Sequence, residues 1–277
     1  MLINNYTLFL IICIISLIIG SFISLASFRI PIILKRKYNK TLISKYNKYK
    51  FYNLAIPRSN CPKCLNTIPL YQNIPLFSYI ALRAKCNKCK EPISIRYPII
   101  ELVTLIIFIL TFFQFGLSID LMAIYIFAFL LIIVSIIDIE HGLLPDIITI
   151  PILIIGILFN YLFMGVTEFY SSLIGAICGY YSLWIIYKIH YFFTNREGLG
   201  YGDFKLMAGL GAWISWQFIP FILFFSSILG IFYSIFLIMF KKHTIRSTIP
   251  FGPFLAIVGF FTFLYKQELL IFYLLYL

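Results

Sequence analysis

Charged side chains are scarce in this sequence. Asp, Glu, Lys and Arg make up 12% of the 277 residues, whereas hydrophobic residues make up 62% and aromatic residues 19%. Soluble domains usually contain about 25% charged residues, so this composition excludes an ordinary soluble protein with one core. The sequence therefore predicts an integral membrane protein.

The sequence also lacks the alternation of apolar and polar residues that outer-membrane barrel strands show. Its apolar runs are continuous and most are long enough to cross a hydrocarbon core about 30 Å thick as helices. We predict an all-α polytopic membrane protein with about eight transmembrane helices, near residues 6–28, 98–116, 121–137, 147–164, 169–189, 206–219, 221–240 and 251–265.

Nucleotide-binding and nucleophile motifs are missing as well. The sequence contains neither GxxxxGK[ST] nor GxGxxG, and His141 and His190 have no evident cysteine or serine partner. These absences leave little support for a nucleotide hydrolase or for covalent catalysis by serine or cysteine.

Basic residues are concentrated in one loop. Between Arg29 and Arg96 lie 15 of the 22 Lys and Arg residues, against a single acid, Glu91. By the positive-inside rule this loop is cytoplasmic and the N-terminus periplasmic, and the net charge of +12 does not indicate nucleic-acid binding. A cleavable signal peptide is disfavoured, because no basic residue precedes the first apolar run.

Counting crossings from this loop places residues 138–146, 190–205 and 241–248 on the cytoplasmic side. The span 206–219 is the weakest, and in an alternative topology Pro220 merely kinks one long helix that runs to residue 240. The basic sequence KKHTIR, at 241–246, would then lie outside, so the positive-inside rule favours eight crossings.

The predicted domains are a first transmembrane helix (1–28), a cytoplasmic tetracysteine domain (29–97) and a membrane domain (98–277). The middle domain contains CPKC and CNKC, with 21 residues between them, and this spacing is typical of a structural zinc site with four thiolate ligands: Cys61, Cys64, Cys86 and Cys89. A redox or iron role and unligated thiols remain alternatives. The Lys-, Asn- and Tyr-rich tract from residue 35 to residue 53 suggests attraction to anionic membrane lipids, with specific binding as the alternative.

Two acids stand out at the predicted cytoplasmic face. Asp138 closes a long apolar run and Asp203 lies directly before another, where an unpaired charge would be costly. Two carboxyl groups held close together share a proton and provide the acid and the base that hydrolyse a peptide bond. The sequence therefore makes these two residues candidate catalytic groups.

Small residues surround one of these acids. Gly200 and Gly202 would let a helix or a substrate backbone approach Asp203 closely, and Lys205 could hold local negative charge. From the residues alone, a purely structural role stays open, because Asp203 and Asp146 are also suitable helix N-caps.

Five ordered motifs resemble those of the bacterial type IV prepilin peptidases, and the resemblance covers nearly the whole chain. They are GSFISLASFRIP at 20–31, the tetracysteine segment up to Glu101, DIEHGLLPD at 138–146, GLGYGDFKL at 198–206 and IPFGPFLAIVG at 249–259. The family's catalytic aspartates open the Dx₆PD element and end GxGD, so the resemblance implies that Asp138 and Asp203 are catalytic.

The resemblance implies an inner-membrane aspartic endopeptidase that cleaves prepilins and pseudopilins after a glycine at the cytoplasmic face. Many relatives with the tetracysteine domain also methylate the new N-terminus with S-adenosylmethionine, so the same activity is expected here. Glu101 is a candidate for amine binding or methyl transfer, or a carboxylate that snorkels to the interface. Alternatives from other classes are a proton-coupled carrier that uses Asp138 and Asp203 as relay groups, and a membrane scaffold whose zinc domain recruits partners.

Overall fold

The computed structural model describes residues 5–38, 52–163, 167–240 and 249–276. Most of the tract predicted to attract lipids and the predicted cytoplasmic loop 241–248 lie outside the described residues. The chain divides into two compact units, residues 1–121 and 122–277.

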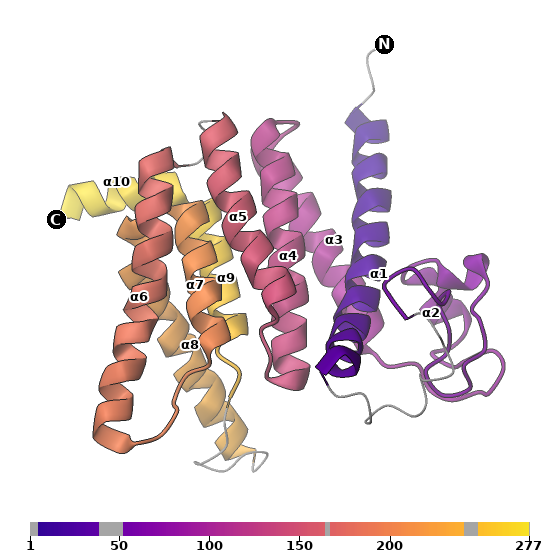
Figure 1. Cartoon of the computed structure of the whole chain (residues 1–277). Coiled ribbons are helices and arrows are strands. Elements are labelled where there is room, and N and C mark those ends of the chain that lie inside the picture. Colours follow the sequence, from indigo (N-terminus) through magenta and orange to yellow (C-terminus); the bar gives the residue numbers. More distant parts are fainter. Residues whose placement is uncertain (1–4, 39–51, 164–166, 241–248, 277) are drawn as a thin grey trace. The chain divides into compact units, whose positions relative to one another are not determined.

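The described residues form helices and two isolated β-bridges, without an extended strand. The first part of the chain contains α1 (Asn5–Tyr38), the 3₁₀ turn η1 (Leu70–Asn73), α2 (Phe77–Ala81), α3 (Arg96–Phe115) and the beginning of α4 (Ile119–His141). The second part continues with α5 (Asp146–Phe163), α6 (Phe169–Thr194), α7 (Tyr201–Ile214), η2 (Trp216–Phe218), α8 (Ile219–Met239), α9 (Gly252–Leu264) and α10 (Lys266–Tyr276) (Figure 1). The predicted all-α fold is confirmed.

Six of the eight predicted membrane segments are helices long and apolar enough to cross a bilayer: α1, α3, α4, α5, α6 and the segment that contains η2 and α8. The other two, α7 and α9, are helices of 14 and 13 residues. At about 1.5 Å rise per residue they are about 20 Å long, which is less than the hydrocarbon thickness. All eight segments are therefore helical, but two of them are too short to span the bilayer alone.

In the first unit, α1 packs against α3, and small residues bring the two helices close together. A Cβ atom on Gly20 would lie 2.9 Å from the Cα atom of Glu101. The buried side chain of Arg29, in α1, donates hydrogen bonds to the carbonyl oxygens of Asn53 and Pro57 at 2.9 and 2.7 Å. This arginine ties the start of the tetracysteine segment to the helix pair.

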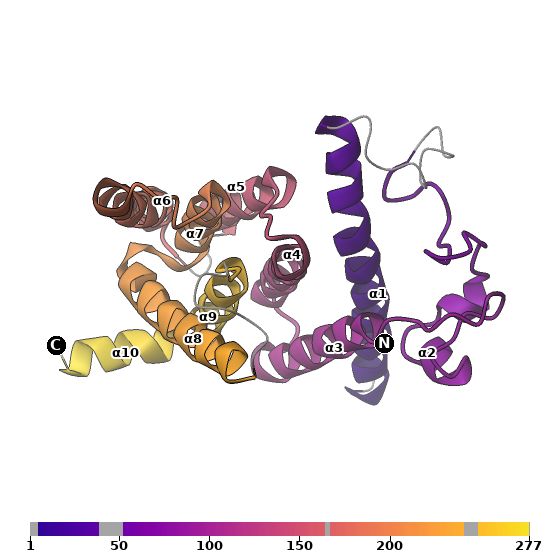
Figure 2. The same cartoon turned by 90° about the horizontal axis from the view of Figure 1, so that it is seen from below.

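In the second unit, α7 lies between α5, α6 and α9 (Figure 2). Every residue from Leu206 to Ile214 is buried, whereas the much longer α8 buries only Ile219, Ile222 and Ser226. Glycines make the contact of α7 with α6 possible, because a Cβ atom on Gly175 would overlap the carbonyl oxygen of Gly211. The short helix α7 therefore forms the core of this unit.

Separate helices α7 and α8 confirm two segments rather than one kinked helix, but the break lies at Ser215 and not at Pro220 as the sequence suggested. Ser215 has φ +102°, outside the helical region, and Pro220 lies in the first turn of α8. Proline fits a first helical turn because the N–H group that it lacks has no helical partner there.

A buried polar network holds the last turn of α7. Asn160 Nδ2 and Ser172 Oγ both donate to the carbonyl oxygen of Ala212, at 2.9 and 2.6 Å. Thr167 Oγ1 donates to the carbonyl oxygen of Trp213 at 3.0 Å and accepts a hydrogen bond from Lys266 Nζ at 2.6 Å. Carbonyl groups at a helix end need such partners when they are buried.

Candidate functional site

Asp138 lies in the last turn of α4 and is only 5% exposed. Its Oδ2 atom accepts a hydrogen bond of 3.0 Å from the backbone N–H of Gly252, the first residue of α9. The position of this carboxyl group is thus fixed by a segment 114 residues further along the chain.

Asp203 lies in the first turn of α7 and is 7% exposed. Its Oδ2 atom accepts a hydrogen bond of 3.2 Å from the backbone N–H of Gly200, which is the N-cap of α7. Asp203 is thus not the N-cap that the sequence suggested but the third helical residue, which caps the N–H of Gly200, and Asp146 is likewise the first residue of α5 and not its N-cap. The contact of Asp203 uses one oxygen, and the other, Oδ1, is buried without a hydrogen-bond partner among the residues that the structure describes.

One leucine lies between the segments that hold these two acids. A Cβ atom on Gly202 would lie 2.5 Å from Cβ of Leu144, and one on Gly252 would lie 2.9 Å from Cδ2 of the same leucine. The structure therefore brings the two candidate acids to the same end of the second unit.

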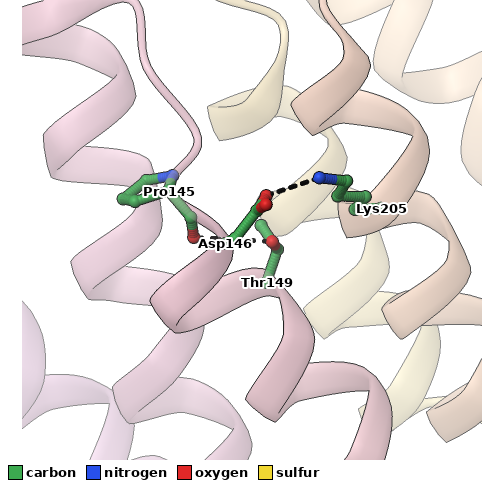
Figure 3. Close-up of polar contacts among 4 residues, drawn as sticks. All are labelled: Pro145, Asp146, Thr149 and Lys205. Carbon is green, nitrogen blue, oxygen red and sulfur yellow. Dashed lines mark hydrogen bonds and ion pairs between the residues drawn. The ribbon is translucent and has the colours of Figure 1, made fainter. Parts of the chain in front are cut away.

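The other residues predicted around Asp203 have defined contacts. Gly202 makes room for Leu144, as expected for a position of close approach, and Gly200 supplies the N–H group that Asp203 accepts. Lys205 does hold an acid, but its partner is Asp146: Lys205 Nζ lies 2.7 Å from Asp146 Oδ1, between the beginning of α7 and the beginning of α5 (Figure 3).

The two CxxC segments form knuckles with the same backbone pattern. In the first, the N–H of Cys61 donates to the carbonyl of Asn66, and the N–H of Leu65 donates to that of Cys61. In the second, the N–H of Cys86 donates to the carbonyl of Glu91, and the N–H of Lys90 donates to that of Cys86. Each knuckle is closed by one isolated bridge, Asn60 with Thr67 and Lys85 with Pro92.

The knuckles bring all four predicted cysteines together. The Sγ atoms of Cys61, Cys64, Cys86 and Cys89 lie within 4.8 Å of one another, and those of Cys61 and Cys89 are 3.8 Å apart. The backbone N–H of Cys89 lowers the pKa of Cys86 to about 7. The backbone N–H of Glu91 also lowers the pKa of Cys89, but burial and the neighbouring thiols outweigh this effect and raise that pKa to about 12. This cluster could hold one metal ion.

Glu101 is buried inside the first unit, with 7% of its surface exposed. Its Oε2 atom accepts the backbone N–H of Leu76 at 2.8 Å, and Ser21 bonds to the same carboxylate. The backbone of Leu76 has φ +59°, so this carboxylate holds a turn that a leucine rarely adopts.

Sequence reasoning missed Gly252 and Leu144 as parts of the site. Both lie inside the motifs IPFGPFLAIVG and DIEHGLLPD. Nothing in the first motif indicates that the N–H of Gly252 binds Asp138, and nothing in the second indicates that Leu144 packs beside Gly202. Their contacts depend on how α4, α7 and α9 pack.

Comparison with known proteins gives two family matches. Residues 14–115 match the bacterial peptidase A24 N-terminal domain, and residues 125–235 match the type IV leader peptidase family. No solved structure matches the chain significantly.

Curated relatives are similar over almost their whole length. A prepilin leader peptidase/N-methyltransferase of Aeromonas hydrophila is 40% identical over 94% of this chain and 91% of that protein. Proteins of the same name from Pseudomonas putida and Legionella pneumophila are 35% and 34% identical, over 92% and 98% of this chain and 90% and 97% of their own lengths. These matches favour the peptidase hypothesis over a carrier or a scaffold, and the chain belongs to the type IV leader peptidase family.

Proposed function

We propose that this protein is an inner-membrane aspartic endopeptidase that removes the leader peptides of type IV prepilins and pseudopilins, with Asp138 and Asp203 as its catalytic acids. The observation that carries the assignment of the acids is their geometry. Two buried carboxyl groups from distant parts of the chain lie at one end of a helical unit, and one oxygen of Asp203 has no partner among the described residues.

Such a pair can hydrolyse an amide without a covalent intermediate. One carboxylate takes a proton from water while the water oxygen bonds to the carbonyl carbon of the scissile peptide. The other, protonated, carboxyl group gives its proton to the nitrogen as the C–N bond breaks. The products are a leader with a new carboxyl group and a mature chain with a new amine.

The location of the site follows from the charge pattern. The dense basic loop between Arg29 and Arg96 supports a cytoplasmic tetracysteine domain and a periplasmic N-terminus. Asp138 and Asp203 then lie at the cytoplasmic face, where a prepilin leader would emerge from the bilayer. In this arrangement the domains are residues 1–28, 29–97 and 98–277.

A structural zinc ion fits the cysteine cluster. A tetrahedral site with Zn–S bonds of about 2.3 Å places its sulfur atoms about 3.8 Å apart, and the Sγ atoms of Cys61 and Cys89 have this separation. Because few apolar residues are buried near the knuckles, metal binding would supply much of their folding free energy. Purified protein should then contain one zinc per chain, and a chain without stoichiometric metal would contradict this assignment.

The second activity, N-methylation, is supported by the names of the curated relatives. S-adenosylmethionine would supply the methyl group to the amine that cleavage releases. Glu101 is a candidate to hold this amine, because a buried carboxylate attracts a cation, although its bond to Leu76 also gives it a structural role.

Mass spectrometry of a coexpressed prepilin tests both activities, because one spectrum reports the cut and any added methyl group. Asp138→Asn and Asp203→Asn preserve the side-chain shapes but remove the acids, and each should leave the precursor uncut. Asp120→Asn is the matched control, since it changes an exposed aspartate at the other end of α4. Processing at the wild-type rate by either test variant would end the assignment of the catalytic pair.

A further inference from the structure

An ion pair joins the two segments that carry the candidate catalytic acids. Asp146 follows Asp138 in the same motif, and Lys205 lies two residues after Asp203. Lys205 Nζ and Asp146 Oδ1 are 2.7 Å apart, although the two residues are 59 positions apart in the sequence (Figure 3). The pair therefore links the first turn of α5 to the beginning of α7.

The acidic partner stands on a fixed backbone. Three groups donate to the carbonyl oxygen of Pro145: the backbone N–H groups of Ile148 and Thr149, at 2.9 and 3.1 Å, and the hydroxyl of Thr149 at 3.4 Å. These bonds lock the start of α5, and Asp146 is its first residue. A salt bridge to such a residue holds its partner in one place.

The basic partner lies near the beginning of α7. Lys205 is the fifth residue of this helix, just after its first turn. Its ammonium group is 2.7 Å from a carboxylate oxygen of Asp146. The side chains of Lys205 and Asp146 are 36% and 57% exposed, so the pair contributes little to stability. Loss of the pair should therefore change the positions of the groups around it, and with them the rate of cleavage, more than the melting temperature.

The pair lies beside the contacts that connect the two acids. Leu144, two residues before Asp146, fills the space between Gly202 and Gly252, and Gly252 in turn donates to Asp138. A shift of Asp146 relative to Lys205 would therefore move Leu144 against both segments. Displacements of about 1 Å at a catalytic site can cost a hundredfold in rate.

We propose that Asp146 and Lys205 are positioning residues, whose ion pair sets the separation between the carboxyl groups of Asp138 and Asp203. This inference rests on the proposed function, because it assigns a role toward the same reaction. Neither side chain takes part in proton transfer. The pair acts by holding α7 in register with the loop that joins α4 to α5.

A double-mutant cycle on the full-length protein in detergent tests the proposal. The variants are Asp146→Asn, Lys205→Gln, their combination and the reversed pair Asp146→Lys with Lys205→Asp. Each single variant should lower kcat for a purified prepilin about tenfold and change KM less than about twofold. The combination should be no slower than the slower single variant, and the reversed pair should recover at least about threefold.

Two controls separate positioning from general damage. Lys205→Arg keeps the cation and should retain about the wild-type rate, and Lys188→Gln removes a lysine that lies over the Trp184 ring, 5.6 Å from its centroid, and should have no effect. Melting temperatures of the single variants should fall by less than about 3 °C.

Wild-type kcat in the single variants, or losses that multiply in the combination, would overturn the proposal, as would a slow Lys205→Arg variant. If only this inference fails, Asp138→Asn and Asp203→Asn still abolish cleavage. If the proposed function fails, those two variants remain active.

Discussion

At its first turn α7 carries a buried carboxyl oxygen, Asp203 Oδ1, without a partner among the described residues, whereas at its last turn side chains from other segments bind its carbonyl groups. The bonds at the last turn come from three segments that surround the helix. The buried oxygen at the first turn instead receives no hydrogen bond from the described residues, which is costly for stability. Within one short helix, the last turn is held by neighbouring segments and the first turn carries an acid that we propose to be catalytic.

The largest expected effect comes from adding a methyl group beside Asp138, at the end of the unit where α7 begins. In Gly252→Ala, the new Cβ atom would lie 2.7 Å from Asp138 Oδ2 and would push this carboxyl group away. Prepilin cleavage should fall about a hundredfold, as expected for a small displacement of a catalytic group. Gly230→Ala is the control, because its new Cβ atom would lie 3.7 Å from its nearest neighbour. Full activity of Gly252→Ala would mean that this contact does not position Asp138.

The next effect concerns the close glycine contact between α6 and α7. In Gly175→Ala, the new methyl group would overlap the carbonyl oxygen of Gly211, and neither backbone can move freely. The free energy of unfolding in micelles should fall by about 2 kcal/mol. Gly230→Ala should raise it slightly, because alanine favours a helix more than glycine does. Equal stabilities for the two variants would show that α6 and α7 can move apart at little cost in free energy.

A smaller effect is expected from the polar network at the last turn. Thr167→Val removes the acceptor of Lys266 and the donor to Trp213, and leaves a buried ammonium group with one bond fewer. Unfolding should become easier by about 1.5 kcal/mol, with cleavage by folded protein unchanged within about twofold. Thr262→Val is matched to it, since that buried hydroxyl donates to the carbonyl oxygen of Val258 in its own helix. A strong loss of kcat in Thr167→Val would contradict the comparison, because it would show that the contacts at the last turn of α7 also affect catalysis.

The smallest effect is expected for Ser172→Ala. The serine donates to the carbonyl oxygen of Ala212, but Asn160 donates to the same oxygen and remains. Unfolding should become easier by only about 0.5 kcal/mol, at the low end for a hydrogen bond. Asn160→Ala should cost more, because it also removes the acceptor for the N–H of Thr167. A larger loss of stability in Ser172→Ala than in Asn160→Ala would show that the serine contributes more to the binding of this carbonyl group.

Sequence patterns predicted the helices and the cluster of four cysteines, because both depend on local spacing. Apolar runs report helices through their length, and CxxC segments close on themselves into knuckles that need one another to bind a metal. The structure also brings Asp138 and Asp203 to the same end, as expected from counting helices; their catalytic role stays a prediction.

Contacts between distant segments could not be predicted. Lys266 fits poorly into an apolar pattern, and only the packing of α10 beside Thr167 explains it. The partner of Lys205 is 59 residues away, and the bond from Gly252 to Asp138 spans 114 residues. The length of α7 and the break at Ser215 likewise depend on surrounding helices and not on the apolar run itself.

The enclosure of α7 has a consequence for biosynthesis. This helix is too short to partition into lipid on its own, and its glycines expose backbone to any solvent that surrounds it. During translation α5 and α6 leave the ribosome first, so the face of α6 that carries Gly175 and Gly179 is already available when α7 emerges. Integration of α7 should therefore proceed by docking onto nascent neighbours. A chain from which α6 is deleted should integrate this segment less efficiently.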